Sequence, residues 1–170
     1  DLKVLISDTT KTSDKKIREV TLKGVHNLKN VSGKYAQFYY SPAASKSKLM
    51  GEAPKAQFVK SNGLYVPSNS ISQQMATLYY HVQQLTDMAI AISPELTPTR
   101  PLPIGLSTIL SEKEGNKNNA FFDGHTQALL FVPYDLDNLP ISVNAGIVAH
   151  EFFHSLFFKE VIQAYDYHTE

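Results

Sequence analysis

The residues His150-Glu151-Phe152-Phe153-His154 place two histidines four positions apart inside an apolar stretch of the chain. Apolar residues at 147–149 and 156–158 flank this motif, which favours a helix. On an α-helix, side chains four residues apart project from the same face, about 6 Å apart along the axis. Two imidazoles in this arrangement can reach one tetrahedral zinc ion. The motif therefore predicts a helix that carries a metal site. The alternative is a pair of core histidines bonded to backbone or tyrosine, because so apolar a helix is expected to be buried.

The carboxylate of Glu151 follows His150 directly, so the helix turns it aside from the metal. In that position it can take a proton from a water that the metal activates, rather than ligate the metal itself. Zinc lowers the pKa of its bound water toward neutrality, which makes a nucleophile for an amide carbonyl. Glu151 is accordingly the predicted general base.

A zinc site needs a third protein ligand. Glu160 is the next carboxylate, but it lies about 9 Å beyond His154 if the helix continues. The ionisable residues near the C-terminus can fold back only if the helix breaks near Gln163; these are Asp166, His168 and Glu170. We expect the third ligand to lie beyond Glu170.

The remaining pattern predicts an α+β fold with a mixed, mostly antiparallel twisted sheet and two long helices in one domain over residues 1–170. Residues 1–67 are rich in short alternating apolar stretches, which is typical of strands. Apolar residues recur at three and four positions over 70–92, which predicts the first long helix. Residues 118–133 form a predicted edge strand and hairpin, and residues 142–164 form the helix of the histidine motif.

Shorter segments carry weaker signals. The hairpin signal Asn62-Gly63 joins two predicted strands. Residues 104–110 are predicted to be a strand, and the Ser/Lys-rich residues 43–53 a loop. Four prolines over 93–103 predict an irregular crossing. His81, on the first helix, is predicted to be structural or exposed, and His125 to be a solvated residue of the hairpin turn.

Composition narrows the partners and the kind of metal site. Sixteen basic residues balance sixteen acidic ones, so the formal net charge is zero and the electrostatic case for nucleic acid or an anionic membrane is removed. No apolar run reaches the roughly 18 residues of a membrane span. The chain has no cysteine, which excludes a disulfide framework and a thiolate metal site. Frequent Lys, Ser, Asn and Thr favour a secreted or periplasmic protein.

Two segments resemble the thermolysin-like zinc metallopeptidases, the gluzincins. One is Ala149-His150-Glu151-Phe152-Phe153-His154, and the other is Asn118-Asn119-Ala120-Phe121-Phe122-Asp123-Gly124 upstream of it. The resemblance implies that His150 and His154 are zinc ligands and that Glu151 is the general base. It also implies that Asn119 and Ala120 contact the backbone of a peptide or protein substrate. An exposed edge strand can hold an extended peptide by adding it as one more strand.

The same resemblance implies a zincin-like fold, of which this chain would be the N-terminal lobe. Gluzincins take their third ligand, a Glu, from a second helix about twenty residues after the second His, which is past Glu170. We therefore expect a helical C-terminal lobe of the same protein to be missing from the chain. The metzincin pattern fits less well, because Phe157 stands where it needs Gly and Glu160 where it needs His.

Three functional hypotheses follow. The first is a zinc-dependent metalloendopeptidase that hydrolyses peptide bonds with a metal-activated water. The second is a non-catalytic fragment or binding protein that retains a metallopeptidase lobe, since two histidines alone hold zinc weakly. The third is a zinc enzyme that acts on another substrate class, although the predicted edge strand favours peptides.

Overall fold

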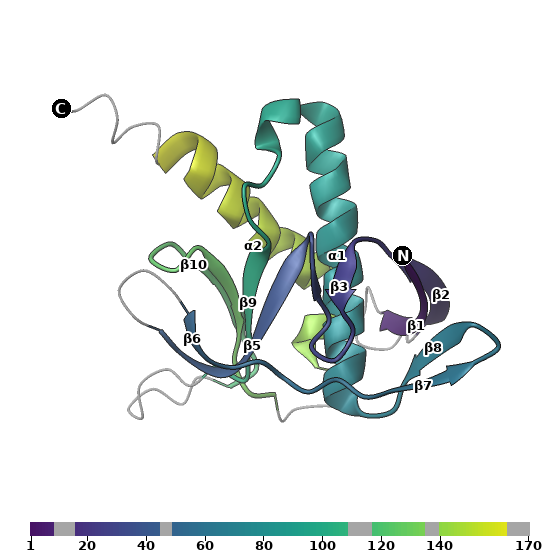
Figure 1. Ribbon diagram of the computed structural model, residues 1–170. Coiled ribbons are helices and arrows are strands. Elements are labelled where there is room, and N and C mark those ends of the chain that lie inside the picture. Colours follow the sequence, from purple (N-terminus) through teal and green to yellow (C-terminus); the bar gives the residue numbers. More distant parts are fainter. Residues whose placement is uncertain (9–15, 45–48, 109–116, 135–139, 163–170) are drawn as a thin grey trace.

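A long helix stands between two sheets in the computed structural model of the chain (Figure 1). The helix is α1 (Ser70–Ile92), and in both views the four-stranded sheet lies on one side of it and the five-stranded sheet on the other. The structure describes residues 1–8, 16–44, 49–108, 117–134 and 140–162.

The four-stranded sheet has the order β2-β1-β8-β7. Its strands are β1 (Leu2–Asp8), β2 (Lys16–Leu22), β7 (Phe58–Ser61) and β8 (Leu64–Pro67). Alternation places Val4, Ile6, Val20 and Leu22 on one buried face, and this face packs against α1. A separate small hairpin joins β3 (Val25–Asn27) to β4 (Ser32–Gly33).

The five-stranded sheet has the order β10-β11-β9-β5-β6, so β10 forms one edge. Its strands are β5 (Ala36–Ala44), β6 (Leu49–Glu52), β9 (Leu102–Leu106), β10 (Ala120–Asp123) and β11 (Ala128–Phe131). Strand β11 is buried on both faces. Leu129 and Phe131 join the main core under the helices, while Leu130 packs with Leu49 and Phe121 on the opposite face.

Helix α1 buries a stripe with helical spacing that includes Met75, Leu78 and Val82. Its N-terminus is capped by Asn69, whose side-chain oxygen accepts the Ser72 N–H at 2.9 Å. The helix ends at Ile92, before Pro94, and a 3₁₀ turn η1 (Pro94–Leu96) follows. This range agrees with the range predicted from periodicity.

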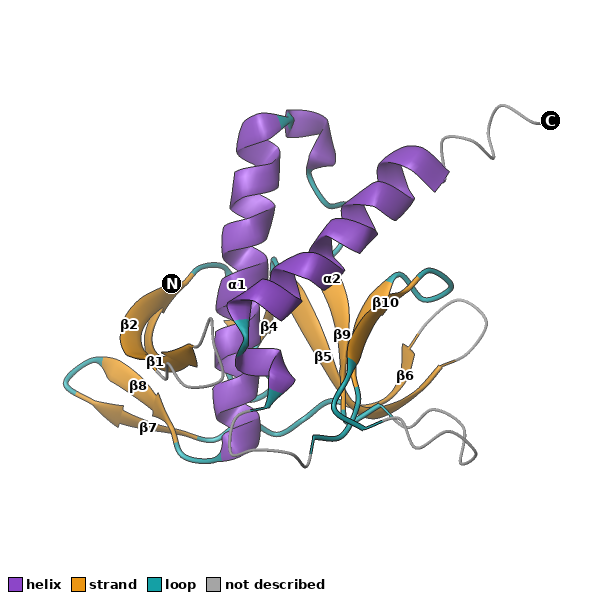
Figure 2. Ribbon diagram, turned by 180° about the vertical axis from the view of Figure 1, so that it is seen from behind, coloured by secondary structure: helices purple, strands orange, loops and turns teal. Residues whose placement is uncertain are grey.

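Helix α2 (Ala145–Phe157) contacts α1 and lies against β10 and β11, as Figure 2 shows from behind. A 3₁₀ turn η2 (Ile141–Val143) precedes it, and a π-helical turn η3 (Phe158–Ile162) continues it. The Asn144 side chain caps its start by accepting the Ile147 N–H at 3.1 Å. The predicted helix 142–164 thus begins three residues later, and its last two residues lie outside the described ranges.

The α+β class with two helices is confirmed, whereas the prediction of a single sheet is wrong. The strands form two large sheets and a small hairpin, and five of the eight strand pairings among described residues are antiparallel. The prediction of a loop over 43–53 is wrong for most of the described residues, because this range contains the end of β5 and the strand β6. Only Leu49 of β6 is buried, which explains why the sequence pattern did not indicate a strand. No described helix is long and apolar enough to cross a membrane.

Candidate metal centre

The two histidines of α2 converge on one point at the surface of the helix. Their Nε2 atoms lie 3.1 Å apart, and their ring centroids are separated by 4.7 Å. Both residues are exposed, and the His150 side chain is 68% accessible. This exposure is incompatible with the alternative of two core histidines. The helical spacing of four residues thus presents both imidazoles to the outside.

The histidine pair fits the geometry of a zinc site. Two nitrogen ligands at about 2.0–2.1 Å from a tetrahedral ion would stand roughly 3.3 Å apart, and the observed separation of the Nε2 atoms is 3.1 Å. Imidazole is also a ligand that zinc commonly takes in proteins. The same distance suits a hydrogen bond between the two rings when one of them carries a proton on Nε2.

Over the described ranges, no third His, Cys, Asp or Glu joins the pair to complete a metal-binding group. Glu160 lies in η3 and is exposed, away from the two histidines along the helix. The other residues weighed from the sequence, Asp166, His168 and Glu170, lie outside the described residues. The described part of the chain would therefore supply only two of the three or more protein ligands that a zinc site needs.

Glu151 lies between the histidine pair and the edge strand. Its side chain is only 11% accessible, unlike that of His150. Its Oε2 accepts a hydrogen bond from the Phe122 N–H at 2.9 Å, and its Oε1 lies 4.0 Å from His150 Nε2. One carboxylate oxygen is thus fixed to β10, and the other faces the histidines. This is the arrangement that a base positioned beside a metal site requires.

The backbone of β10 presents alternate residues to its open side. The Asn119 carbonyl accepts the Val132 N–H at 3.1 Å, so Asn119 faces β11. In an antiparallel ladder the next residue points its backbone groups the other way. Ala120 and Phe122 therefore direct their N–H and C=O groups away from β11, and the bond from Phe122 to Glu151 agrees with this. The open edge of the sheet runs alongside α2.

The Asn119 side chain folds back on its own strand. Its Oδ1 accepts the Ala120 N–H at 2.9 Å. Two backbone N–H groups on the open side of β10 therefore already have acceptors. The Ala120 N–H donates to the Asn119 side chain, and the Phe122 N–H donates to Glu151. The backbone carbonyls of Ala120 and Phe122 also point to the open side of β10, where they can accept hydrogen bonds.

An apolar groove extends from the candidate metal centre. Its lining combines Glu151 and His154 with aromatic residues of β10, α2 and η3: Phe121, Phe122, Phe157 and Phe158. The rings of Phe122 and Phe158 lie 5.7 Å apart, and they join the edge strand to the end of the helix. Phe153 and Phe157 are 53% and 57% exposed, so α2 is less buried than its apolar sequence predicts.

The other histidines that were weighed stand apart from this centre. His125 is exposed in the turn between β10 and β11, where its N–H donates to Asp123 Oδ1, as a solvated turn residue would. His81 is buried on α1, with 6% exposure. The sequence interpretation missed the role of the Phe122 N–H. Phe122 lies two residues after Ala120 and therefore on the same side of the predicted strand. This spacing is the signal in the sequence that could have identified its N–H as part of the site.

The chain matches no protein-family model and shows no significant similarity to a curated protein.

Proposed function

We propose that this chain is the zinc-binding lobe of a zinc-dependent metalloendopeptidase of the gluzincin type. The observation that carries the proposal is the convergence of three groups: His150 and His154 with their Nε2 atoms 3.1 Å apart, and Glu151 beside them. The anchoring of Glu151 to an open edge strand supports a peptide as the substrate.

In this proposal His150 and His154 hold the zinc through Nε2. When bound, zinc supplies Lewis acidity, which lowers the pKa of water and polarises a carbonyl. Glu151 accepts the proton of the attacking water on Oε1, the oxygen that faces the histidines, and passes it on to the leaving amine. The Phe122 N–H keeps the carboxylate in place during this transfer, because it holds Oε2.

The substrate lies extended along the open side of β10. Its backbone N–H groups donate to the outward carbonyls of Ala120 and Phe122, as an added strand would. Asn119 contributes through its amide group, which lies next to Ala120. The groove formed by the phenylalanines of β10, α2 and η3 receives an apolar side chain of the substrate.

The third zinc ligand comes, in this proposal, from a helical C-terminal lobe of the same protein. That lobe also covers the exposed Phe153 and Phe157. Its groups complete the cleft and stabilise the charge that develops on the substrate carbonyl. Export to the periplasm or the exterior belongs to the same proposal and rests on composition alone.

A second candidate is a non-catalytic protein that keeps the lobe for binding. One observation favours it: over the described residues, no third His, Cys, Asp or Glu joins the two histidines in a group that could hold a metal ion. A zinc enzyme with a non-peptide substrate would leave the open edge of β10 without a role, and for that reason we do not favour it.

The test uses the protein expressed from its complete coding sequence, with zinc measured by elemental analysis and activity by casein hydrolysis. We expect Glu151→Gln to lower activity by about 10²–10⁴-fold, the usual contribution of a general base, with zinc content unchanged. The matched control is Glu160→Gln, an exposed glutamate of η3, which should behave as wild type. Undiminished cleavage by Glu151→Gln would sink the mechanism. A wild-type protein with neither stoichiometric zinc nor cleavage would support the binding protein instead.

A further inference from the structure

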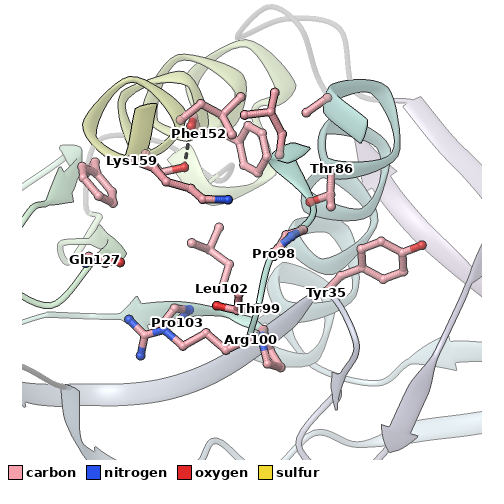
Figure 3. Close-up of a pocket in the computed structure, with 16 residues that line it drawn as sticks. Tyr35, Thr86, Pro98, Thr99, Arg100, Leu102, Pro103, Gln127, Phe152 and Lys159 are labelled. Atoms are coloured by element: carbon pink, nitrogen blue, oxygen red, sulfur yellow. Dashed lines mark hydrogen bonds between the residues drawn. The ribbon is translucent and has the colours of Figure 1, made fainter. Parts of the chain in front are cut away.

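A second cavity lies on the side of α2 away from the histidines, and Figure 3 shows its lining. It is built from several parts of the fold, of which α1, β9 and α2 supply much of the lining. Thr86 and Ala89 come from the end of α1, Leu102 from the start of β9, and Phe152 and Leu156 from α2. Neither His150, Glu151 nor His154 belongs to the lining. The cavity therefore contains none of the candidate metal-site side chains, although Phe122 lines both this cavity and the groove beside the histidines.

The walls of this cavity are mostly apolar. The lining includes Ala89, Leu96, Leu102, Phe152 and Leu156, together with the three prolines of the 98–103 segment. A ligand that fills such a space with an aliphatic or aromatic body removes apolar area from water, at roughly 25 cal/mol per Å². Pockets of this type bind small molecules when a few polar groups fix the orientation.

Two cationic side chains stand at this cavity, and its lining includes no acidic residue. Lys159 reaches from η3 toward the middle of the cavity, and Leu102 points toward it from the opposite wall (Figure 3). Arg100 lies on the lower side, where its Nη2 donates to the Thr126 carbonyl at 3.4 Å. Over the described residues no ion pair engages Lys159 or Arg100.

Asp87, which follows the lining residue Thr86 in the sequence, has its carboxylate already occupied. Asp87 accepts the hydroxyl of the lining residue Tyr35 at 2.7 Å and lies 3.4 Å from Lys23 Nζ. Thr86 and Gln127 add neutral polar groups. Over the described residues the cavity thus combines apolar walls and neutral polar groups with two cationic side chains that no ion pair engages. This combination favours an anionic ligand over a neutral or cationic one.

We propose that this cavity binds a small amphipathic carboxylate, a molecule with one carboxylate group and an apolar body of medium-chain length. The apolar body lies between Leu102 and Leu156. The carboxylate pairs with Lys159, with Arg100 at its other side, because charge-assisted hydrogen bonds to carboxylates are stronger than neutral ones. The proposal does not depend on zinc or on peptidase activity.

The test measures binding of three matched probes by isothermal titration calorimetry: octanoate, 1-octanol and octylammonium. The protein is expressed from its complete coding sequence. We expect octanoate to bind at least about tenfold more tightly than the other two, a difference of about 1.4 kcal/mol. Equal affinities for octanoate and octanol would show that the cavity does not recognise the carboxylate and would overturn the proposal. A lack of octanoate binding would overturn it as well.

Variants of Lys159 and Arg100 test whether these two side chains bind the carboxylate of octanoate. Lys159→Met keeps the length of an apolar stem and removes the ammonium, so it should weaken octanoate about tenfold and leave octanol unchanged. Arg100→Gln, at an exposed position, should weaken octanoate without affecting folding. The control Lys55→Met removes an exposed lysine elsewhere and should bind octanoate as wild type does. Octanoate binding that survives both Lys159→Met and Arg100→Gln contradicts the proposal.

Discussion

The backbone N–H of Phe122 donates a 2.9 Å hydrogen bond to Oε2 of Glu151, and this bond joins the edge strand β10 to helix α2. The two residues are 29 positions apart in the sequence. The carboxylate is consequently fixed by the strand along which we propose that the substrate lies. Because both partners are held by regular elements, the bond also contributes to the docking of α2.

Replacing Glu151 by Ala should therefore destabilise the fold, apart from any effect on catalysis. The substitution removes the acceptor of a part-buried N–H, which costs about 1–2 kcal/mol. Glu151→Gln retains an oxygen acceptor and should cost about half as much. Urea unfolding measures both, and hydrogen exchange should show a faster Phe122 amide in the Ala variant only. Equal losses in the two variants would mean that the hydrogen bond does not hold the strand.

The histidine pair should bind zinc as a unit. We expect His150→Ala and His154→Ala each to weaken zinc binding at least about tenfold, because each removes one nitrogen ligand from an incomplete set. The control is His125→Ala, which removes an exposed histidine of the β10–β11 turn and should leave the affinity unchanged. Competition against a chromophoric chelator gives the three affinities. If His125→Ala weakens zinc as much as the other two do, the metal lies elsewhere.

The sequence predicts the structural features that depend on the local spacing of residues. The spacing of apolar residues over Ser70–Ile92 predicts α1, and Asn62-Gly63 predicts the hairpin β7–β8. The spacing of His150 and His154 predicts their convergence. These features depend on residues close together in the chain, for which local geometry decides the outcome.

Features that depend on contacts between distant segments were not predictable in this way. The strand β6 has only Leu49 to mark it, and it forms because β5 offers an edge to pair with. The buried position of Glu151 results from the placement of β10 against α2. The cavity at Lys159 combines α1, the proline-rich segment and α2, and no single stretch of sequence carries its signature.

The alkaline stability of the protein should report on Tyr35. Burial first, then the hydrogen bond to Asp87 and the charge of that carboxylate, raise the pKa of Tyr35 to about 12. The unfolded chain has an ordinary tyrosine pKa of about 10. Between these values the folded state keeps a proton that the unfolded state loses, so the free energy of unfolding falls as the pH rises from about 10 to about 12.

Below about pH 10, Tyr35 makes no contribution to the pH dependence of stability, because both states hold the proton. Asp87→Asn removes the charge and leaves the burial, so the pKa of Tyr35 should fall without reaching its ordinary value. Ultraviolet difference titration of tyrosinate measures this shift, with Tyr35→Phe to identify the signal. Part of the alkaline loss should remain in Tyr35→Phe, since burial also raises the pKa of Tyr79. An unchanged titration in Asp87→Asn would assign the shift to burial alone.

The start of helix α2 should depend on Asn144. Its Oδ1 accepts the Ile147 N–H at 3.1 Å and so satisfies one of the free donors of the first turn of α2. Asn144→Ala removes this cap and should lower the free energy of unfolding by about 1 kcal/mol. Asn144→Asp keeps an acceptor and adds a negative charge at the helix N-terminus, where the helix dipole favours it, so this variant should be at least as stable as wild type. Urea unfolding compares the three proteins, and hydrogen exchange at residues 147–150 should accelerate only in the Ala variant. If Asp and Ala destabilise equally, the side chain of Asn144 acts through packing against its neighbours and not as the cap of α2.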